Sequence, residues 1–136
     1  MSFPRISLIL AGVSFLALGV VVLVAPEDLM RFAGLPADRP ASVVELEARY
    51  GGLHVALGLF FLISSFRFRW VRAALGAQIL VFGGLAAGRL AGLLQSPVRN
   101  RIQILYLSLE CLGAALGFVG FRQAKTLLLN SRTPSL

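Results

Sequence analysis

The chain has 136 residues, of which 57% are hydrophobic and only 14% are charged. Soluble domains carry about 25% charged residues, so this composition excludes a disordered chain and most soluble folds. The net charge of +7 would suit nucleic-acid binding, but the 13 basic residues are scattered among apolar runs. We therefore expect a membrane protein with the lipid bilayer as its main partner and no nucleic acid.

Four apolar runs are long enough to cross a bilayer, which takes about 20 residues for a hydrocarbon core of about 30 Å. They predict transmembrane helices at about 6–25, 47–66, 71–94 and 101–121. The first run is longer than the apolar region of a signal peptide, so we expect it to be retained. Short connections make neighbouring helices antiparallel. The predicted fold is all-α, a four-transmembrane-helix antiparallel bundle formed by one domain over residues 1–136.

The connections carry helix start and stop signals. The range Pro26–Asp28 is typical of an acidic first helical turn and Gly34 of a helix end, which predicts a short interfacial helix between the first two spans. Ser42 and Glu45 form a capping box, so the second long helix should begin at Ser42. Ser96 and Pro97 likewise predict the start of the fourth helix.

The distribution of charge predicts the orientation in the membrane. One side has only basic residues, whereas the other has equal numbers of basic and acidic residues, including every acidic residue of the chain. Because basic loops stay in the cytoplasm, both termini should be cytoplasmic. If the source is bacterial, we expect the protein in the cytoplasmic membrane. The basic side comprises Arg5, Arg67, Arg69, Arg72, Arg122, Lys125 and Arg132.

Glycines recur at helical spacing in the predicted spans. Lipid provides no hydrophobic force between helices, so small residues that allow close approach usually mark packing faces. We expect these glycines to pack the bundle, and a homo-oligomer face on the third helix is the alternative. They are Gly51 and Gly58 in the second span, Gly84, Gly88 and Gly92 in the third, and Gly113 and Gly117 in the fourth.

Polar and titratable side chains gather toward the side opposite the basic one. Charged groups within a membrane are costly, which makes them functional candidates. With Ser42, Gln95 and Ser96 taken as one level, a rise of ~1.5 Å per residue separates an upper layer at about 8–10 Å from a deeper one at about 18–21 Å. The upper layer contains Glu47, Arg49, Arg89 and Gln103, the deeper one His54 and Glu110, and Tyr50 and Tyr106 lie between them.

Three readings of this cluster remain open. Pairs such as Arg89 with Glu47, and His54 with Glu110, could lock the helices together. A small polar pocket between the second, third and fourth helices could bind a ligand or lipid headgroup, with Arg49 and Arg89 holding an anionic or carbonyl group. A proton relay or redox site is the third reading. Helical spacing supports inward-facing stripes, because Glu47, Tyr50 and His54 are three or four residues apart.

Sequence templates for catalysis are absent, including those of metalloproteases, serine hydrolases, phosphate-binding loops and dinucleotide-binding folds. With one histidine and one cysteine, a metal site would need mostly carboxylates. We therefore predict no metal site and no catalytic residue, and we favour a non-enzymatic role.

Residues 47–52 (Glu-Ala-Arg-Tyr-Gly-Gly), leading into Leu53–Leu62, together with Gly88–Arg89 and Glu110, resemble the signature of domain-of-unknown-function family 4345 (DUF4345). The resemblance covers nearly the whole chain. It implies a small four-helix bacterial membrane protein with a DoxX-like layout, and no particular activity. The family tends to have an Asp-Gly-x-Pro turn after the third helix, where this chain has Gln95-Ser96-Pro97, so a role for that carboxylate is in doubt.

The function predicted from these observations is that of an accessory subunit or a lipid- or small-molecule-binding module. Its expected partners are the bilayer and either a second membrane protein or further copies of itself. The alternative implied by the DoxX-like layout is a component of a quinone-linked redox complex, in which quinone would be the cofactor and Glu110 and His54 would carry protons. An oligomeric transporter is a third class, disfavoured because four spans are few.

Overall fold

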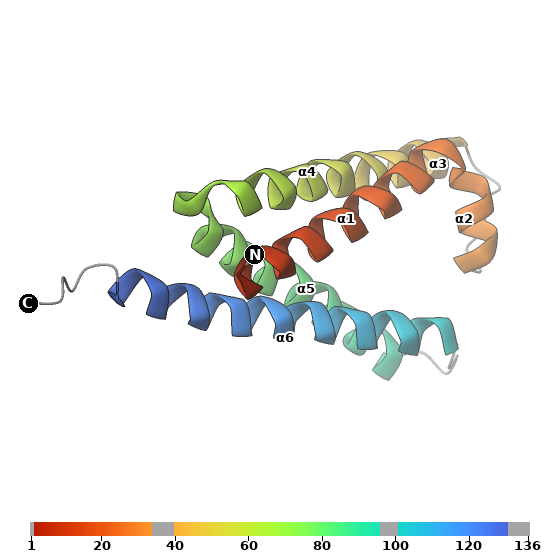
Figure 1. Cartoon of the computed structure of the whole chain (residues 1–136). Coiled ribbons are helices and arrows are strands. Elements are labelled where there is room, and N and C mark those ends of the chain that lie inside the picture. The colour runs from red at the N-terminus through yellow and green to blue at the C-terminus, as the bar shows by residue number, and fades with distance from the viewer. Residues whose placement is uncertain (1, 34–39, 96–100, 131–136) are drawn as a thin grey trace, which may run out of the picture. The chain divides into compact units, whose positions relative to one another are not determined.

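The computed structural model describes residues 2–33, 40–95 and 101–130, and the regular structure of these residues is helical (Figure 1). Six of the elements are α-helices, and one, η1, is a short π-helix continuous with its neighbours. In chain order they are α1 (Phe3–Val24), α2 (Pro26–Ala33), α3 (Pro40–Leu46), η1 (Glu47–Gly52), α4 (Leu53–Phe66), α5 (Phe68–Gln95) and α6 (Arg101–Asn130).

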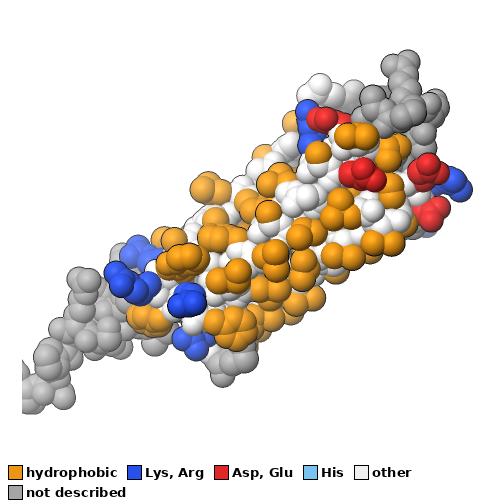
Figure 2. Space-filling model, turned by 90° about the horizontal axis from the view of Figure 1, so that it is seen from above, with side chains coloured by type: hydrophobic (Ala, Val, Ile, Leu, Met, Phe, Trp, Pro, Cys, Tyr) orange, Lys and Arg blue, Asp and Glu red, His pale blue; other side chains and the backbone are white. Residues whose placement is uncertain are grey.

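Four helical segments of the described chain are long and apolar enough to cross a membrane: Phe3–Val24, Val43–Phe66, Phe68–Gln95 and Arg101–Ala124. They coincide with the four predicted spans, which confirms the all-α fold. The predicted short helix is α2, whose first turn carries Glu27 and Asp28, where carboxylates complement the positive end of the helix dipole. Hydrophobic side chains cover much of the described surface seen in Figure 2, as expected of helices that face lipid.

Contacts divide the chain into two compact units. Unit 1 comprises Met1–Ile9 and Ser64–Leu136, and therefore contains the start of α1 together with α5 and α6. Unit 2 comprises Leu10–Ile63, and therefore contains the rest of α1 and the helices as far as α4. The prediction of a single domain stays a prediction.

Glycines bring α1 and α4 into close contact in unit 2. A Cβ atom placed on Gly58 would lie 2.6 Å from the backbone nitrogen of Leu16 and 2.9 Å from the carbonyl oxygen of Gly12. A Cβ on Gly19 would likewise lie 2.7 Å from the backbone nitrogen of Val55. The two helix backbones are therefore in direct contact, which only residues without a side chain permit.

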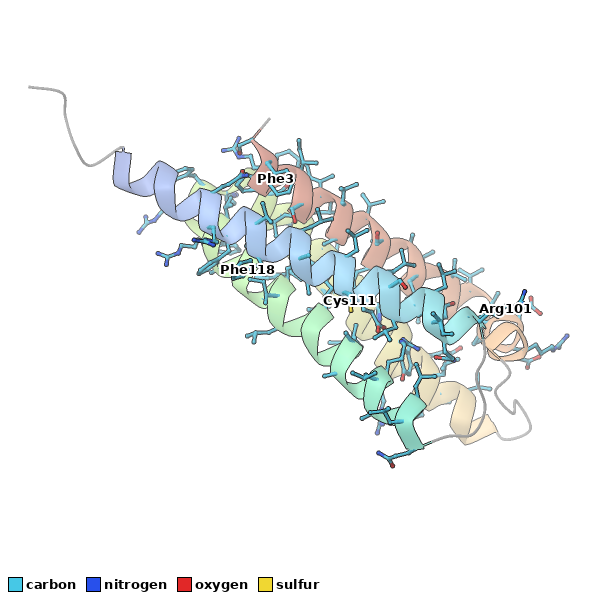
Figure 3. All side chains as sticks on the ribbon, turned by 90° about the horizontal axis from the view of Figure 1, so that it is seen from below. Phe3, Arg101, Cys111 and Phe118 are labelled. Atoms are coloured by element: carbon cyan, nitrogen blue, oxygen red, sulfur yellow. The ribbon has the colours of Figure 1, made fainter. Side chains whose placement is uncertain are left out.

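In unit 1, α5 and α6 form an antiparallel hairpin and lie side by side along their length (Figures 1 and 3). Two glycines of α6 show how α5 and α6 are aligned with each other. A Cβ on Gly113 would lie 2.4 Å from the ring of Phe82, and one on Gly120 would lie 3.0 Å from Leu75. The Phe82 ring therefore occupies the space that a side chain at position 113 would need.

A buried amide fixes this hairpin to the start of α1. Gln78 is 1% exposed, and its Nε2 donates to the carbonyl oxygen of Gly113 at 2.9 Å and to the hydroxyl of Ser7 at 3.1 Å. Buried polar groups are costly unless they are paired, and membrane interiors offer no water as a substitute. This amide therefore selects one register among α1, α5 and α6.

Helix boundaries differ from the predictions at three places. The second long helix begins at Pro40 instead of Ser42, because proline has a helical φ and the first turn does not need its missing N–H. Its continuation passes through η1, which periodicity did not predict. The last helix runs beyond the predicted end at Phe121 to Asn130. The predicted start at Ser96 and Pro97 and the predicted stop at Gly34 lie outside the described residues.

The predicted packing glycines fall into two groups. Gly51 and Gly58 contact α1, and Gly113 and Gly117 contact α5. In contrast, a Cβ on Gly84, Gly88 or Gly92 would meet nothing within 4 Å in the described part of the chain. The glycine stripe of α5 is therefore not what holds the α5–α6 hairpin together.

Candidate functional site

The register of the hairpin determines which polar residues of α5 and α6 meet. Two turns along from the contact of Phe82 with Gly113, Tyr106 lies opposite Arg89, and the Arg89 guanidinium carbon is 5.1 Å from the centre of the Tyr106 ring. Gln103 and Glu110 lie about one turn to either side of Tyr106 on the same face of α6. A single arginine therefore reaches all three side chains.

Arg89 is held to Glu110 by a multidentate ion pair. Its Nε donates to the two carboxylate oxygens of Glu110 at 3.0 and 2.9 Å, and its Nη2 donates to Oε1 at 2.6 Å. Its Nη1 donates to the amide oxygen of Gln103 at 2.5 Å. Such fork-like pairing fixes the plane of the guanidinium as well as its position.

The pair is largely removed from the surface. The side chain of Glu110 is 9% exposed and that of Arg89 is 25% exposed. An isolated arginine or carboxylate at the centre of a membrane helix costs about 2.5–3.5 kcal/mol on insertion scales, so each charge depends on the other. Desolvation offsets most of the attraction within a buried pair, which makes such a pair weak evidence of a purely stabilising role.

The structure revises the predicted two layers, because Arg89 of the upper layer binds Glu110 of the deeper one directly. The prediction placed Gln95 and Ser96 at one level and thereby put these residues about 12 Å apart. The observed register places Glu110 only one turn, about 6 Å, beyond the level of Arg89. The long arginine side chain spans that distance.

The other four predicted site residues, Glu47, Arg49, Tyr50 and His54, belong to unit 2. The Arg49 guanidinium contacts the carboxylate of Glu45 one turn earlier on the same helix, and both side chains are more than half exposed. An exposed pair of this kind contributes at most about 1 kcal/mol to stability. The prediction that these residues share a pocket with Arg89 stays a prediction.

His54 is buried between two aromatic rings of unit 2. It is 7% exposed, and its ring centre lies 5.0 Å from that of Phe15 and 5.7 Å from that of Tyr50, in stacked orientations. No described residue forms a hydrogen bond with its Nδ1. The π-helix η1 ends two residues before it, and π-helical turns are frequent at functional sites.

Sequence reasoning missed Gln78 and the π-helix. Gln78 interrupts an otherwise apolar stretch of the third span, and that isolated amide was the available signal. The π-helix has no comparable signal, because one inserted residue per turn leaves the composition of an apolar helix unchanged. Among the described residues, no group of three histidine, cysteine or acidic side chains could hold a metal ion.

Comparison with known protein families gives one match. Residues 3–121 match the family described as Domain of unknown function (DUF4345). The chain belongs to DUF4345. The match includes every residue on which the resemblance was based, and it extends over the four candidate spans. Searches of curated proteins and of solved structures gave no match for this DUF4345 chain.

Proposed function

We propose that this protein is a non-enzymatic integral membrane module that binds the polar group of a lipid or membrane-soluble small molecule beside Arg89 and Glu110. The observation that carries the proposal is the Arg89–Glu110 pair, placed within two membrane-spanning helices and flanked by Gln103 and Tyr106. Ion pairs in such segments are rare, and they commonly mark binding sites or transport paths.

The charges of the site favour a neutral ligand group over a free anion. The Glu110 carboxylate already matches the positive charge of Arg89, so an added anion would compete with it. The amide of Gln103 and the hydroxyl of Tyr106 instead supply neutral hydrogen-bonding groups next to the pair. A carbonyl or hydroxyl group on an apolar molecule suits this combination, and the Tyr106 ring supplies an apolar wall.

The proton-relay alternative receives less support from these contacts. A proton carrier has to exchange hydrogen-bond partners, whereas three contacts from one guanidinium hold Glu110. A quinone in an organic extract of the purified protein would fit either role, because its carbonyl groups are also groups that the binding module could hold. The absence of any extracted quinone would favour the binding module.

Native mass spectrometry of protein purified from its own membranes in mild detergent tests the proposal. The unaltered protein should retain a small molecule, and Arg89→Gln should lose it while remaining folded by circular dichroism. Arg101→Gln is the matched control, because it removes an exposed arginine from the same hairpin, at the first residue of α6. If both variants retained the small molecule as well as the unaltered protein does, the Arg89–Glu110 pair would only join the helices. The same conclusion would follow if the unaltered protein retained no small molecule.

A further inference from the structure

A second cluster of arginines lies at the end of unit 1 that is remote from the Arg89 site. There the start of α1, the start of α5 and the last part of α6 enclose a small open cavity of about 30 Å³. In Figure 3, Phe3 lies at the far end of the hairpin from Arg101. The cavity is lined by Ser2 just before α1, Pro4 and Arg5 of α1, Phe68, Val71 and Arg72 of α5, and Ala124 of α6.

Among the described residues, neither Arg5 nor Arg72 takes part in an ion pair. Glu110, which is bound to Arg89, is the one acidic residue in the sequence ranges of unit 1. Arg72 instead lies with its guanidinium carbon 4.9 Å from the centre of the Phe121 ring. That aromatic contact orients the side chain without neutralising its charge. The cavity is therefore bordered by two uncompensated positive charges.

Two helix N-termini add to the positive potential of the cavity. Pro4 and Phe68 belong to the first turns of α1 and α5, where the helix dipole is positive. The N–H groups of Arg5 and Trp70 already donate to the carbonyl oxygens of Ser2 and Arg67, so the dipole is the main contribution of these turns. Arginine side chains and helix N-termini together are the donors that commonly bind phosphate oxygens. A cavity of this volume matches about one water molecule, so it has room for a phosphate oxygen and not for a whole headgroup.

Aromatic residues place this cavity at the membrane surface. Phe66, Phe68 and Trp70 are 74%, 57% and 53% exposed, and they flank the start of α5 at the end of two membrane-spanning segments. Exposed aromatics at the ends of spans lie at the level of lipid headgroups. A phosphate group held at this level belongs to a phospholipid.

We propose that Arg5, Arg72 and the N-terminal turns of α1 and α5 bind the phosphate of an anionic phospholipid. The lipid acyl chains then lie along the apolar outer faces of the helices, and the remaining headgroup lies over the open side of the cavity. Arg67 and Arg69 stay outside the cavity and contribute only to the general positive surface.

The test compares two pairs of substitutions that remove equal charge at the same end of the protein. The full chain is mixed in detergent with phosphatidylglycerol and phosphatidylcholine, and the retained lipids are measured by native mass spectrometry. The unaltered protein should prefer phosphatidylglycerol. Arg5→Gln with Arg72→Gln should lower that preference about tenfold, the factor expected from one charge-assisted hydrogen bond. Arg67→Gln with Arg69→Gln should lower it much less.

Equal losses in the two double variants would overturn the proposal, because they would indicate a diffuse basic surface. Equal retention of both lipids by the unaltered protein would overturn it too. If the first double variant folds poorly, the unaltered protein provides the measurement: phosphatidylglycerol should raise its Tm more than phosphatidylcholine, and equal effects would refute the site. A large excess of inorganic phosphate should leave the lipid bound, since displacement would indicate a site for free phosphate.

Discussion

The guanidinium of Arg89 on α5 binds the carboxylate of Glu110 on α6 through Nε and Nη2, within segments that are long and apolar enough to cross a membrane. The two residues are separated by the turn of the hairpin, and neither is the nearest neighbour of the other in the helix register. This pair joins two helices, and we propose that it also places polar groups for a ligand; the two roles can be separated by experiment.

Replacing either partner alone should destabilise the protein by about 3 kcal/mol, because the remaining charge is left unpaired in a buried site. Arg89→Met and Glu110→Met are the informative single variants. The double variant should recover most of the loss, since an apolar pair of similar volume removes both desolvation costs. Unfolding in mild detergent, followed by circular dichroism, measures the three variants. Additive losses in the double variant would argue against direct coupling.

The glycines of α4 and α5 should respond differently to the addition of one methyl group. Gly58→Ala would bring its Cβ to 2.6 Å from the backbone of Leu16, so α1 and α4 must move apart and Tm should fall clearly. Gly88→Ala meets nothing within 4 Å and should leave Tm unchanged or raise it slightly, because alanine favours helix. Similar Tm values for the two variants would contradict the observed helix contact.

Gln78→Leu should destabilise unit 1, although by less than the loss of a charge pair. The substitution leaves the Ser7 hydroxyl and the Gly113 carbonyl without their present partner. Interhelical hydrogen bonds in membrane proteins contribute about 0.6 kcal/mol on average and at most about 1.7 kcal/mol. Chemical unfolding of Gln78→Leu and of Ser7→Ala should show the larger effect for Gln78, which bonds two helices instead of one.

Two substitutions of His54 test whether the stability of unit 2 depends on the packing of its ring or on its polar nitrogens. His54→Phe retains a ring between Phe15 and Tyr50 and removes the unpartnered Nδ1, so it should be close to neutral for Tm. His54→Ala opens a cavity in unit 2 and should cost about 2–4 kcal/mol, as large-to-small core substitutions do. Equal losses of Tm in His54→Phe and His54→Ala would contradict this explanation, because they would show that an aromatic ring alone does not restore the packing.

The predicted orientation remains a prediction and has a direct measurement. If both termini are cytoplasmic, a reporter that works only in the cytoplasm should be active when it is fused after residue 136. A reporter that works only outside the cytoplasm should be inactive at the same position. A cysteine introduced at Arg69 should then be protected from a membrane-impermeant thiol reagent in intact cells. Labelling at that position would reverse the orientation and place the basic cluster on the outer surface. Cys111 should first be replaced by serine, since it is an exposed free thiol.

The sequence by itself determined the four candidate spans, the short helix between the first two of them and the residues from which a polar site could form. Uninterrupted apolar runs carry this information locally, because the length of a run is compared directly with the thickness of a bilayer. Helix ends were less certain, as Pro40 and Asn130 show, because capping signals compete with neighbouring residues that continue a helix equally well.

Only the tertiary structure decided that Arg89 pairs with Glu110 and that Gln78 bonds Ser7 and Gly113. It also decided that Gly84, Gly88 and Gly92 of α5 stand apart from the contact with α6. These facts depend on the register between helices. That register is determined by complementary shapes, such as the Phe82 ring in the space above Gly113. Helical periodicity in the sequence shows which residues share one face of a helix. It does not show how far that helix is shifted along its neighbour. A shift of one turn moves a charged side chain by about 5.4 Å, which is enough to exchange its partner.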